Sequence, residues 1–479
     1  MRISSTHAGS LAVGIALLLV PVTDAGYADD VGYTQLKAEL GAATPSGSSV
    51  SVTQVEGRND VDAQGNPLDA FPNYLPDAAN AQFAGKTINA RTPGGQVSSH
   101  ATAVGQYFYG STSSIAPGIT TIDAFEVNDW LGSGWLRTGS TSAPVSDGRK
   151  VQNHSWVGSA GASDPEILRR LDYAINNNNG GSGFTAVVGL NNGSGNAHPP
   201  LLSNAYNAIA VGRSDGNHSR GTTTADGAGR VKPDLVVPLG ATSWATPVVG
   251  AAAALVIDKS NTTPALANAS RPQAVKAILM AGATKAEFGA AWDRTPTRPL
   301  DEVFGAGELN VYRSYHVLTA GEQAAGSASL VSTTGWDFAT AASTTQTYYF
   351  DVPAMHELTE LSTILTWNRV VQDGVAGPSF GNLTSSLANL DLQLYTVDGF
   401  SLGTLLDQSI SAVDNVEHIY RPTALTAGRY AMQVTTDTLN TNYALAWHGS
   451  LTAVPEPGAA AVVAMMTGWM LARRRRVCG

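Results

Sequence analysis

Residues 240 to 250 read GATSWATPVVG and lead directly into the apolar run AAAALVID. A serine among small residues, with a proline four positions later and an apolar run behind it, predicts a tight turn followed by a buried helix. Pro247 fits the first turn of that helix, where its missing N–H leaves no hydrogen bond unmade. The Ser243 hydroxyl would then lie among unpaired backbone N–H groups at the positive end of the helix. Ser243 is therefore a candidate nucleophile for acyl transfer, with an N-cap of a core helix as the alternative.

The same stretch resembles the active-serine segment of the subtilisin-like serine proteases, the subtilases. In that family the acid, the histidine and the serine follow one another in this order, so the resemblance implies a histidine motif upstream. Residues 98 to 110 read SSHATAVGQYFYG and resemble that motif, in which the histidine opens a helix. The resemblance makes His100 the general base, and a surface histidine on a turn is the alternative.

The candidate acid closes the segment VSVTQVEG at residues 50 to 57, whose valines predict a buried strand. Subtilases carry the aspartate of the triad at the end of their first core strand, and the resemblance puts Glu56 there. Glutamate can orient a histidine as aspartate does, although its extra methylene requires a shifted backbone or rotamer. We favour Glu56 because a carboxylate that closes an apolar strand is otherwise costly to bury. Asp60 and Asp62 remain alternatives.

The resemblance also implies an oxyanion-hole amide after the predicted strand FTAVVGL at residues 184 to 190. Subtilases present an asparagine at this place, and the sequence continues as NNGSG. We assign the role to Asn192 and keep Asn191 as the alternative, because the glycine that normally precedes the functional asparagine is absent. An asparagine in a left-handed turn is the structural explanation of the same residue.

A further segment, VQNHSWVG at residues 151 to 158, resembles the subtilase strand that lines the substrate cleft. The resemblance places Ser155, Trp156 and Gly158 beside the pocket for the side chain that precedes the scissile bond. Core packing explains the same apolar run equally well.

Three features around Ser243 depart from the subtilase pattern. Ala241 replaces a glycine, Trp244 replaces a methionine, and only Leu239 to Thr242 separate the serine from the preceding strand, where most relatives carry a hairpin. We expect a cleft that is wider on the leaving-group side.

The expected function is an exported serine endopeptidase that hydrolyses protein or peptide substrates through an acyl-enzyme. The alternative is a catalytically inactive subtilase-like scaffold that acts as a cell-surface or matrix binding protein.

Composition limits the partners of the chain. Its 479 residues, 50 glycines and 14% charged residues are typical of a loop-rich globular protein with more than one domain. The net charge of −10 argues against nucleic acid or anionic membrane surfaces as partners. The single cysteine, Cys478, lies in the extreme tail, so we expect no internal disulfide. We assign no metal or cofactor. Calcium on carboxylates of the second domain stays possible but unassigned.

The order of segments predicts the following organisation. Residues 1 to 28, with Arg2, the run LAVGIALLLV and a break at Ala25 or Ala28, are typical of a secretory signal peptide. The resemblance then implies an α/β subtilisin-like domain with a mainly parallel central sheet at 29–318. A Gly-, Ala- and Ser-rich linker spans 319–330. Short alternating strands at 331–450 predict an antiparallel β-sandwich, similar to the jelly-roll domain of some secreted subtilases.

The final segment, 451–479, contains VPEP from Val454, a short apolar run and four arginines at Arg473 to Arg476. It resembles the PEP-CTERM sorting signal, whose tail is removed by a membrane transpeptidase. The resemblance implies that this sorting transpeptidase is a partner, that the membrane is met only transiently, and that the mature protein stays at the cell surface or in the extracellular matrix. A permanent tail anchor is the alternative.

Overall fold

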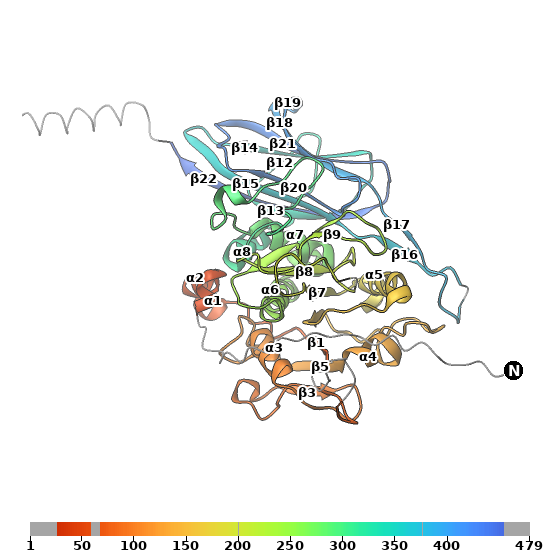
Figure 1. Cartoon of the computed structure of the whole chain (residues 1–479). Helices are drawn as coiled ribbons and strands as arrows, with labels where there is room; N and C mark the ends of the chain where they lie inside the picture. Colours follow the sequence, from red (N-terminus) through yellow and green to blue (C-terminus); the bar gives the residue numbers. More distant parts are fainter. Residues whose placement is uncertain (1–25, 59–67, 200, 376, 455–479) are drawn as a thin grey trace, which may run out of the picture.

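The structure, a computed structural model, describes residues 26–58, 68–199, 201–375 and 377–454. Residues 1–25 of the expected signal peptide, the alternative acids Asp60 and Asp62, and the tail from residue 455 lie outside the described residues. The described chain forms an α/β unit followed by a unit of antiparallel sheets (Figure 1).

A seven-stranded sheet forms the centre of the first unit, and each neighbouring pair of its strands runs parallel. The prediction of an α/β domain with a mainly parallel sheet is thus confirmed. In spatial order the strands are β11 (Leu235–Val237), β8 (Ile209–Arg213), β7 (Thr185–Gly189), β6 (Val151–His154), β1 (Val52–Glu56), β5 (Thr121–Glu126) and β3 (Thr87–Ala90).

Helices cover both faces of this sheet. Side chains alternate between the two faces along each strand, so neighbouring residues of one strand pack into different cores. Val187 packs into the core that contains helices α3, α6 and α7, whereas Val188 packs into the core beside α5. Both cores combine buried aliphatic and aromatic side chains. The bounds of these helices are α3 (Ser99–Tyr109), α5 (Asp164–Gly181), α6 (Thr242–Thr262) and α7 (Pro272–Gly282).

Helix α6 begins earlier than the sequence predicts. It starts at Thr242, so Ser243 lies in the first turn and Pro247 lies inside the helix rather than in the first turn. The small residues allow close packing: a Cβ added to Gly250 would lie 3.0 Å from the Phe108 ring of helix α3. The run AAAALVID is buried, as expected of a core helix.

Shorter elements surround this core. Two small sheets pair β2 (Asn73–Leu75) with β4 (Gln96–Val97), and β9 (Gly221–Thr222) with β10 (Val231–Lys232). The remaining helices are α1 (Gly26–Asp30), α2 (Tyr33–Leu40), α4 (Val127–Asp129) and α8 (Val311–Thr319), with short turns η1 (Gly41–Ala43), η2 (Ala81–Phe83), η3 (Trp130–Gly134), η4 (Gly161–Ser163), η5 (Pro264–Ser270) and η6 (Gly289–Ala291).

The second unit consists mainly of two sheets that share one hydrophobic core. Its pairs are antiparallel except for β12 with β14. One sheet has the order β12 (Leu330–Val331), β14 (Thr345–Val352), β21 (Gly428–Thr436), β18 (Leu390–Asp398) and β19 (Ser401–Ser409); the other has β13 (Gly335–Thr340), β22 (Asn442–Ala453), β15 (His356–Trp367) and β20 (Val416–Arg421). A hairpin of β16 (Val370–Gln372) and β17 (Thr384–Ser386) projects from this unit toward α5 (Figure 1).

The two units share a buried interface. Ile364 and Ala446 of the four-stranded sheet belong to the same core as helices α6 and α7. Arg369 reaches from the second unit into the first, where it donates hydrogen bonds to Asp172 and Asp226 and is only 3% exposed. Because a buried guanidinium needs such partners, its two carboxylates fix the position of one unit on the other.

The described chain begins inside the fold. Tyr27 in helix α1 is 4% exposed, its ring packs on Tyr107, and its hydroxyl donates to the Ser113 carbonyl at 2.6 Å. Cleavage of a signal peptide after Ala28 would remove this side chain, whereas cleavage after Ala25 would keep it. Among the described residues, no helix has both the length and the apolar character that crossing a bilayer requires.

Candidate active site

The structure brings Glu56 and His100 into direct contact. Glu56 is the last residue of β1, and its Oε2 lies 2.8 Å from Nδ1 of His100. A carboxylate accepts hydrogen bonds, so this contact favours the tautomer in which Nδ1 is the donor; in a neutral imidazole the lone pair is then on Nε2. His100 is fixed at the start of α3, where the Ser98 hydroxyl caps the helix by accepting from the Ala101 amide. This carboxylate–histidine pair is almost completely buried.

Glu56 is also held by the side chain of Gln54. Gln54 lies two residues earlier on the same strand, so its side chain projects from the same face of the sheet. Its Nε2 donates to Glu56 Oε1 and to the Ala101 carbonyl, both at 2.8 Å, and its Oε1 accepts from the Tyr109 hydroxyl at 2.6 Å. Burial and the charge of Glu56 raise the pKa of Tyr109, so this hydroxyl stays a donor. Both carboxylate oxygens of Glu56 therefore have a fixed partner.

Ser243 lies in the first turn of α6, and its carbonyl is held from outside the helix. Pro247 has no N–H to donate back to this carbonyl. The Ser155 hydroxyl takes that place and donates to the Ser243 carbonyl at 3.1 Å. Asn153 in turn donates to the Ser155 hydroxyl at 3.0 Å. The end of strand β6 thus fixes the start of helix α6.

Trp244 connects the serine to the histidine. Its ring centroid lies 5.3 Å from that of His100 and 6.0 Å from that of Tyr107. The residue that follows Ser243 therefore packs against the ring of the candidate base. Within the described part of the chain, no hydrogen bond joins the Ser243 hydroxyl to His100.

Asn192 lies beside the start of α6. Its Oδ1 accepts hydrogen bonds from the backbone N–H of Thr242 at 3.0 Å and from the Thr242 hydroxyl at 3.3 Å. Neither Nδ2 of Asn192 nor the backbone N–H of Ser243 has a hydrogen-bond partner among the described residues. The arrangement leaves two donors available near the serine. Asn191 instead pairs through its backbone with Ser219.

The three residues expected beside the substrate cleft have different environments. The Ser155 hydroxyl donates to the Ser243 carbonyl, as described above. Trp156 is 6% exposed and packs in the core on the α5 side of the sheet. Gly158 accepts a backbone hydrogen bond from Leu201 at 3.1 Å. The structure thus brings Ser155 to Ser243 and gives Trp156 the packing role that sequence analysis kept open.

His154 is a buried polar residue that sequence analysis does not single out. Its ring lies 4.6 Å from the Trp130 ring and 6.0 Å from the Trp156 ring, and neither ring nitrogen has a partner among the described residues. Complete burial lowers its pKa to about 3, so the imidazole stays neutral. We interpret it as a packing residue of the aromatic core.

The alanine that replaces a glycine before Ser243 does not strain the backbone. Ala241 has φ −150° and ψ 147°, an extended conformation that any residue adopts, so a glycine is not required. Within the described ranges, no group of three or more His, Cys, Asp or Glu side chains is placed to hold a metal ion.

Comparison with known proteins adds no identification. No known family model matches the chain, and no curated protein is significantly similar to it in sequence.

Proposed function

We propose that the chain is a serine endopeptidase of the subtilisin-like type. In this proposal His100 Nε2 takes the proton from the Ser243 hydroxyl as Oγ attacks the substrate carbonyl, and Glu56 stabilises the imidazolium that forms. The proton then passes to the leaving amine, the peptide bond breaks, and water hydrolyses the acyl-enzyme. The observation that carries the proposal is the buried hydrogen bond between Glu56 and His100, because it fixes the tautomer that a general base needs.

The oxyanion in this proposal is bound by two donors. These are Nδ2 of Asn192 and the backbone N–H of Ser243, which have no other partner within the described ranges. Thr242 supports the assignment, because it holds Oδ1 of Asn192 and so turns the donor end of the amide away from itself. Donors that are fixed before the reaction stabilise developing charge without reorganisation.

Digestion of casein by the purified protein tests this function. We expect cleavage by the wild-type protein and its loss in His100→Ala and Ser243→Ala, with thermal midpoints close to that of the wild type. The Ser99→Ala variant is the control for expression and handling, because Ser99 is a neighbour of His100 without a proposed role. Equal casein cleavage by wild type and Ser243→Ala would contradict the proposal, because it would show that Ser243 is not needed for the activity.

One observation favours the second candidate function, an inactive scaffold that binds at the cell surface or in the matrix. The Ser243 hydroxyl makes no hydrogen bond to His100 in the described structure, and the Trp244 ring packs on the histidine. Catalytic hydrogen bonds often form only when substrate is bound, so we rank the peptidase first. An inactive scaffold predicts no cleavage by wild-type protein at any pH.

We further propose that the protein is exported and then processed at its tail. VPEP from Val454, the apolar run and the arginine cluster support removal of the chain after about Pro457. The buried position of Tyr27 supports a signal-peptide cut at Ala25. Mass spectrometry of the surface protein should find a first peptide that begins at Gly26 and no peptide that contains Trp469. Recovery of the Trp469 peptide from mature surface protein would instead establish a permanent anchor.

A further inference from the structure

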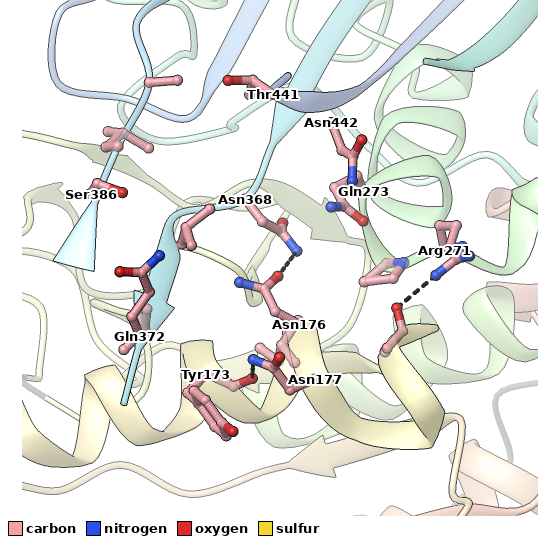
Figure 2. A pocket seen from close by; sticks show the side chains of 18 of the residues that line it. Tyr173, Asn176, Asn177, Arg271, Gln273, Asn368, Gln372, Ser386, Thr441 and Asn442 are labelled. Carbon is pink, nitrogen blue, oxygen red and sulfur yellow. Dashed lines mark hydrogen bonds between the residues drawn. The ribbon is translucent and has the colours of Figure 1, made fainter. Parts of the chain in front are cut away.

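A cavity of about 800 Å³ lies between the two units, away from the candidate active site. It is bordered by the end of α5 and the start of α7 in the first unit, and by β16, β17 and the segment 438–442 in the second (Figure 2). Its volume falls within the roughly 300–1,000 Å³ of small-molecule sites, and such sites are frequent at domain interfaces.

The cavity and the candidate active site lie at opposite edges of the central sheet. Glu56 ends β1 and Asn192 follows β7, so the catalytic groups lie at the carboxyl edge. The cavity instead includes Gly181 and Gly183, which precede the first residue of β7, Thr185. A ligand in this cavity would therefore leave the peptide-cleaving groups free.

The lining of the cavity mixes polar and apolar side chains and carries no net charge among its described residues. Its described charged residues are Arg271 and Asp373. Arg271 donates to the Gly181 carbonyl at 2.7 Å and lies over the Phe338 ring, while Asp373 accepts from the backbone amides of residues 375 and 381. One cation and one anion give the described lining no net charge, and each already makes hydrogen bonds, so the cavity favours an uncharged ligand over a phosphate or a carboxylate.

Several carboxamide side chains line the cavity, and Figure 2 shows Asn176, Asn177, Asn368, Gln273, Gln372 and Asn442 around one common space. Asn368 donates to Asn176 at 2.7 Å, which fixes the middle of the floor. The side-chain amides of Gln273 and Gln372 face this space from opposite sides and have no hydrogen-bond partner among the described residues. Each such amide presents both donors and an acceptor.

Apolar side chains complete the lining. Val370 and Leu439 are 47% and 49% exposed, so they present apolar surface beside the amides. A sugar ring combines the matching properties: hydroxyls that both donate and accept, no charge, and apolar C–H faces. We propose that this cavity is a binding site for a neutral oligosaccharide. The proposal is independent of catalysis, because no residue of the cavity belongs to the candidate active site.

Isothermal titration calorimetry on the full-length protein tests this proposal with maltohexaose, cellohexaose, mannohexaose and xylohexaose. We expect at least one of them to bind. Gln273→Ala and Gln372→Ala should each weaken that binding about 3- to 10-fold, the effect of one lost hydrogen bond. Their unpartnered side chains should be removable without loss of folding, which the thermal midpoint checks. Gln96→Ala is the matched control, because Gln96 is an exposed glutamine outside the cavity.

Two comparison ligands separate the alternatives. A galacturonate hexamer tests for an acidic glycan, and a hexapeptide of glycine, serine and asparagine tests for an uncharged peptide. The proposal is overturned if none of the neutral hexasaccharides binds, if either comparison ligand binds more tightly than all of them, or if the Gln273 and Gln372 variants bind as the wild type does. Binding that persists in Ser243→Ala shows that the site is separate from catalysis.

Discussion

The Ser155 hydroxyl donates a hydrogen bond to the Ser243 carbonyl, which Pro247 leaves without its helical partner. The contact ties the end of strand β6 to the turn of helix α6 that carries the candidate nucleophile. A proline at this position is therefore tolerated because a side chain from another element replaces the missing backbone donor.

This relationship predicts a dependence between two substitutions. Ser155→Ala should lower the free energy of unfolding by about 1–3 kcal/mol, because it leaves the Ser243 carbonyl unsatisfied. In a Pro247→Ala background the same substitution should cost less, since the new amide at position 247 can donate to that carbonyl. Urea unfolding of the four proteins in this double-mutant cycle measures the coupling. Strict additivity would show that Ser155 acts elsewhere.

The contact of Gln54 with Glu56 predicts that substituting either residue lowers kcat, with the larger loss at Glu56. Glu56→Gln should lower kcat by about 10⁴, as does replacing the acid of other triads with its amide, because the wrong tautomer of His100 becomes favoured. Gln54→Met removes one donor to the carboxylate and should lower kcat by roughly 10- to 100-fold with little change in KM. Steady-state kinetics on a fluorogenic peptide separate these effects. A variant of Gln54 with raised KM and normal kcat would contradict a positioning role.

Substitutions of Asn192 and Asn191 should affect kcat differently, because only Asn192 is assigned to the oxyanion hole. Asn192→Asp keeps an oxygen for the Thr242 amide but has no N–H to donate, so kcat should fall by about 10²–10³. Asn191→Ala should leave kcat near the wild-type value, because Asn191 engages Ser219 through its backbone. The same peptide assay compares the two variants. A large loss of kcat in Asn191→Ala would move the oxyanion-hole assignment to Asn191.

Local patterns predict the buried strand β1, whereas the parallel sheet and the pairing of Glu56 with His100, 44 residues apart, are expected only from the resemblance to subtilases. The valines of β1 set its buried faces, and Glu56 follows them in register. The start of α6 is missed because Pro247 is typical of a first turn. Its actual place depends on Ser155, which lies 88 residues earlier and approaches only in the folded chain. Gln54 is missed although the strand period of two places it beside Glu56, because a buried glutamine has no functional signature of its own.

A buried amine links stability to pH at the boundary of the two units. Lys285 donates to the Ala283 carbonyl and to the Ser362 hydroxyl, and its Nζ lies 4.7 Å from the centre of the Tyr420 ring. Burial lowers the pKa of Lys285 from its ordinary value of 10.5 to about 7. Between these two pKa values the unfolded chain holds a proton that the folded chain has released, so this group makes stability rise with pH.

Replacing the amine tests the sign of this linkage. The thermal midpoint of the wild type minus that of Lys285→Met should rise by several degrees between pH 7 and pH 10 and stay level below pH 6. Other titrating groups contribute to both proteins and largely cancel in the difference. Differential scanning calorimetry across this range measures the midpoints. A difference that falls with increasing pH would show that the folded amine is held in its charged form.

Labelling with a fluorophosphonate probe tests the central claim most directly, because the probe reacts with an activated serine and needs no knowledge of the substrate. The wild-type protein should take up one probe, and peptide mapping should place it on Ser243. Ser243→Ala should remain unlabelled while unfolding at nearly the same temperature. A folded wild-type protein that takes up no probe, or equal labelling of the wild type and Ser243→Ala, would contradict the assignment of Ser243 as the nucleophile.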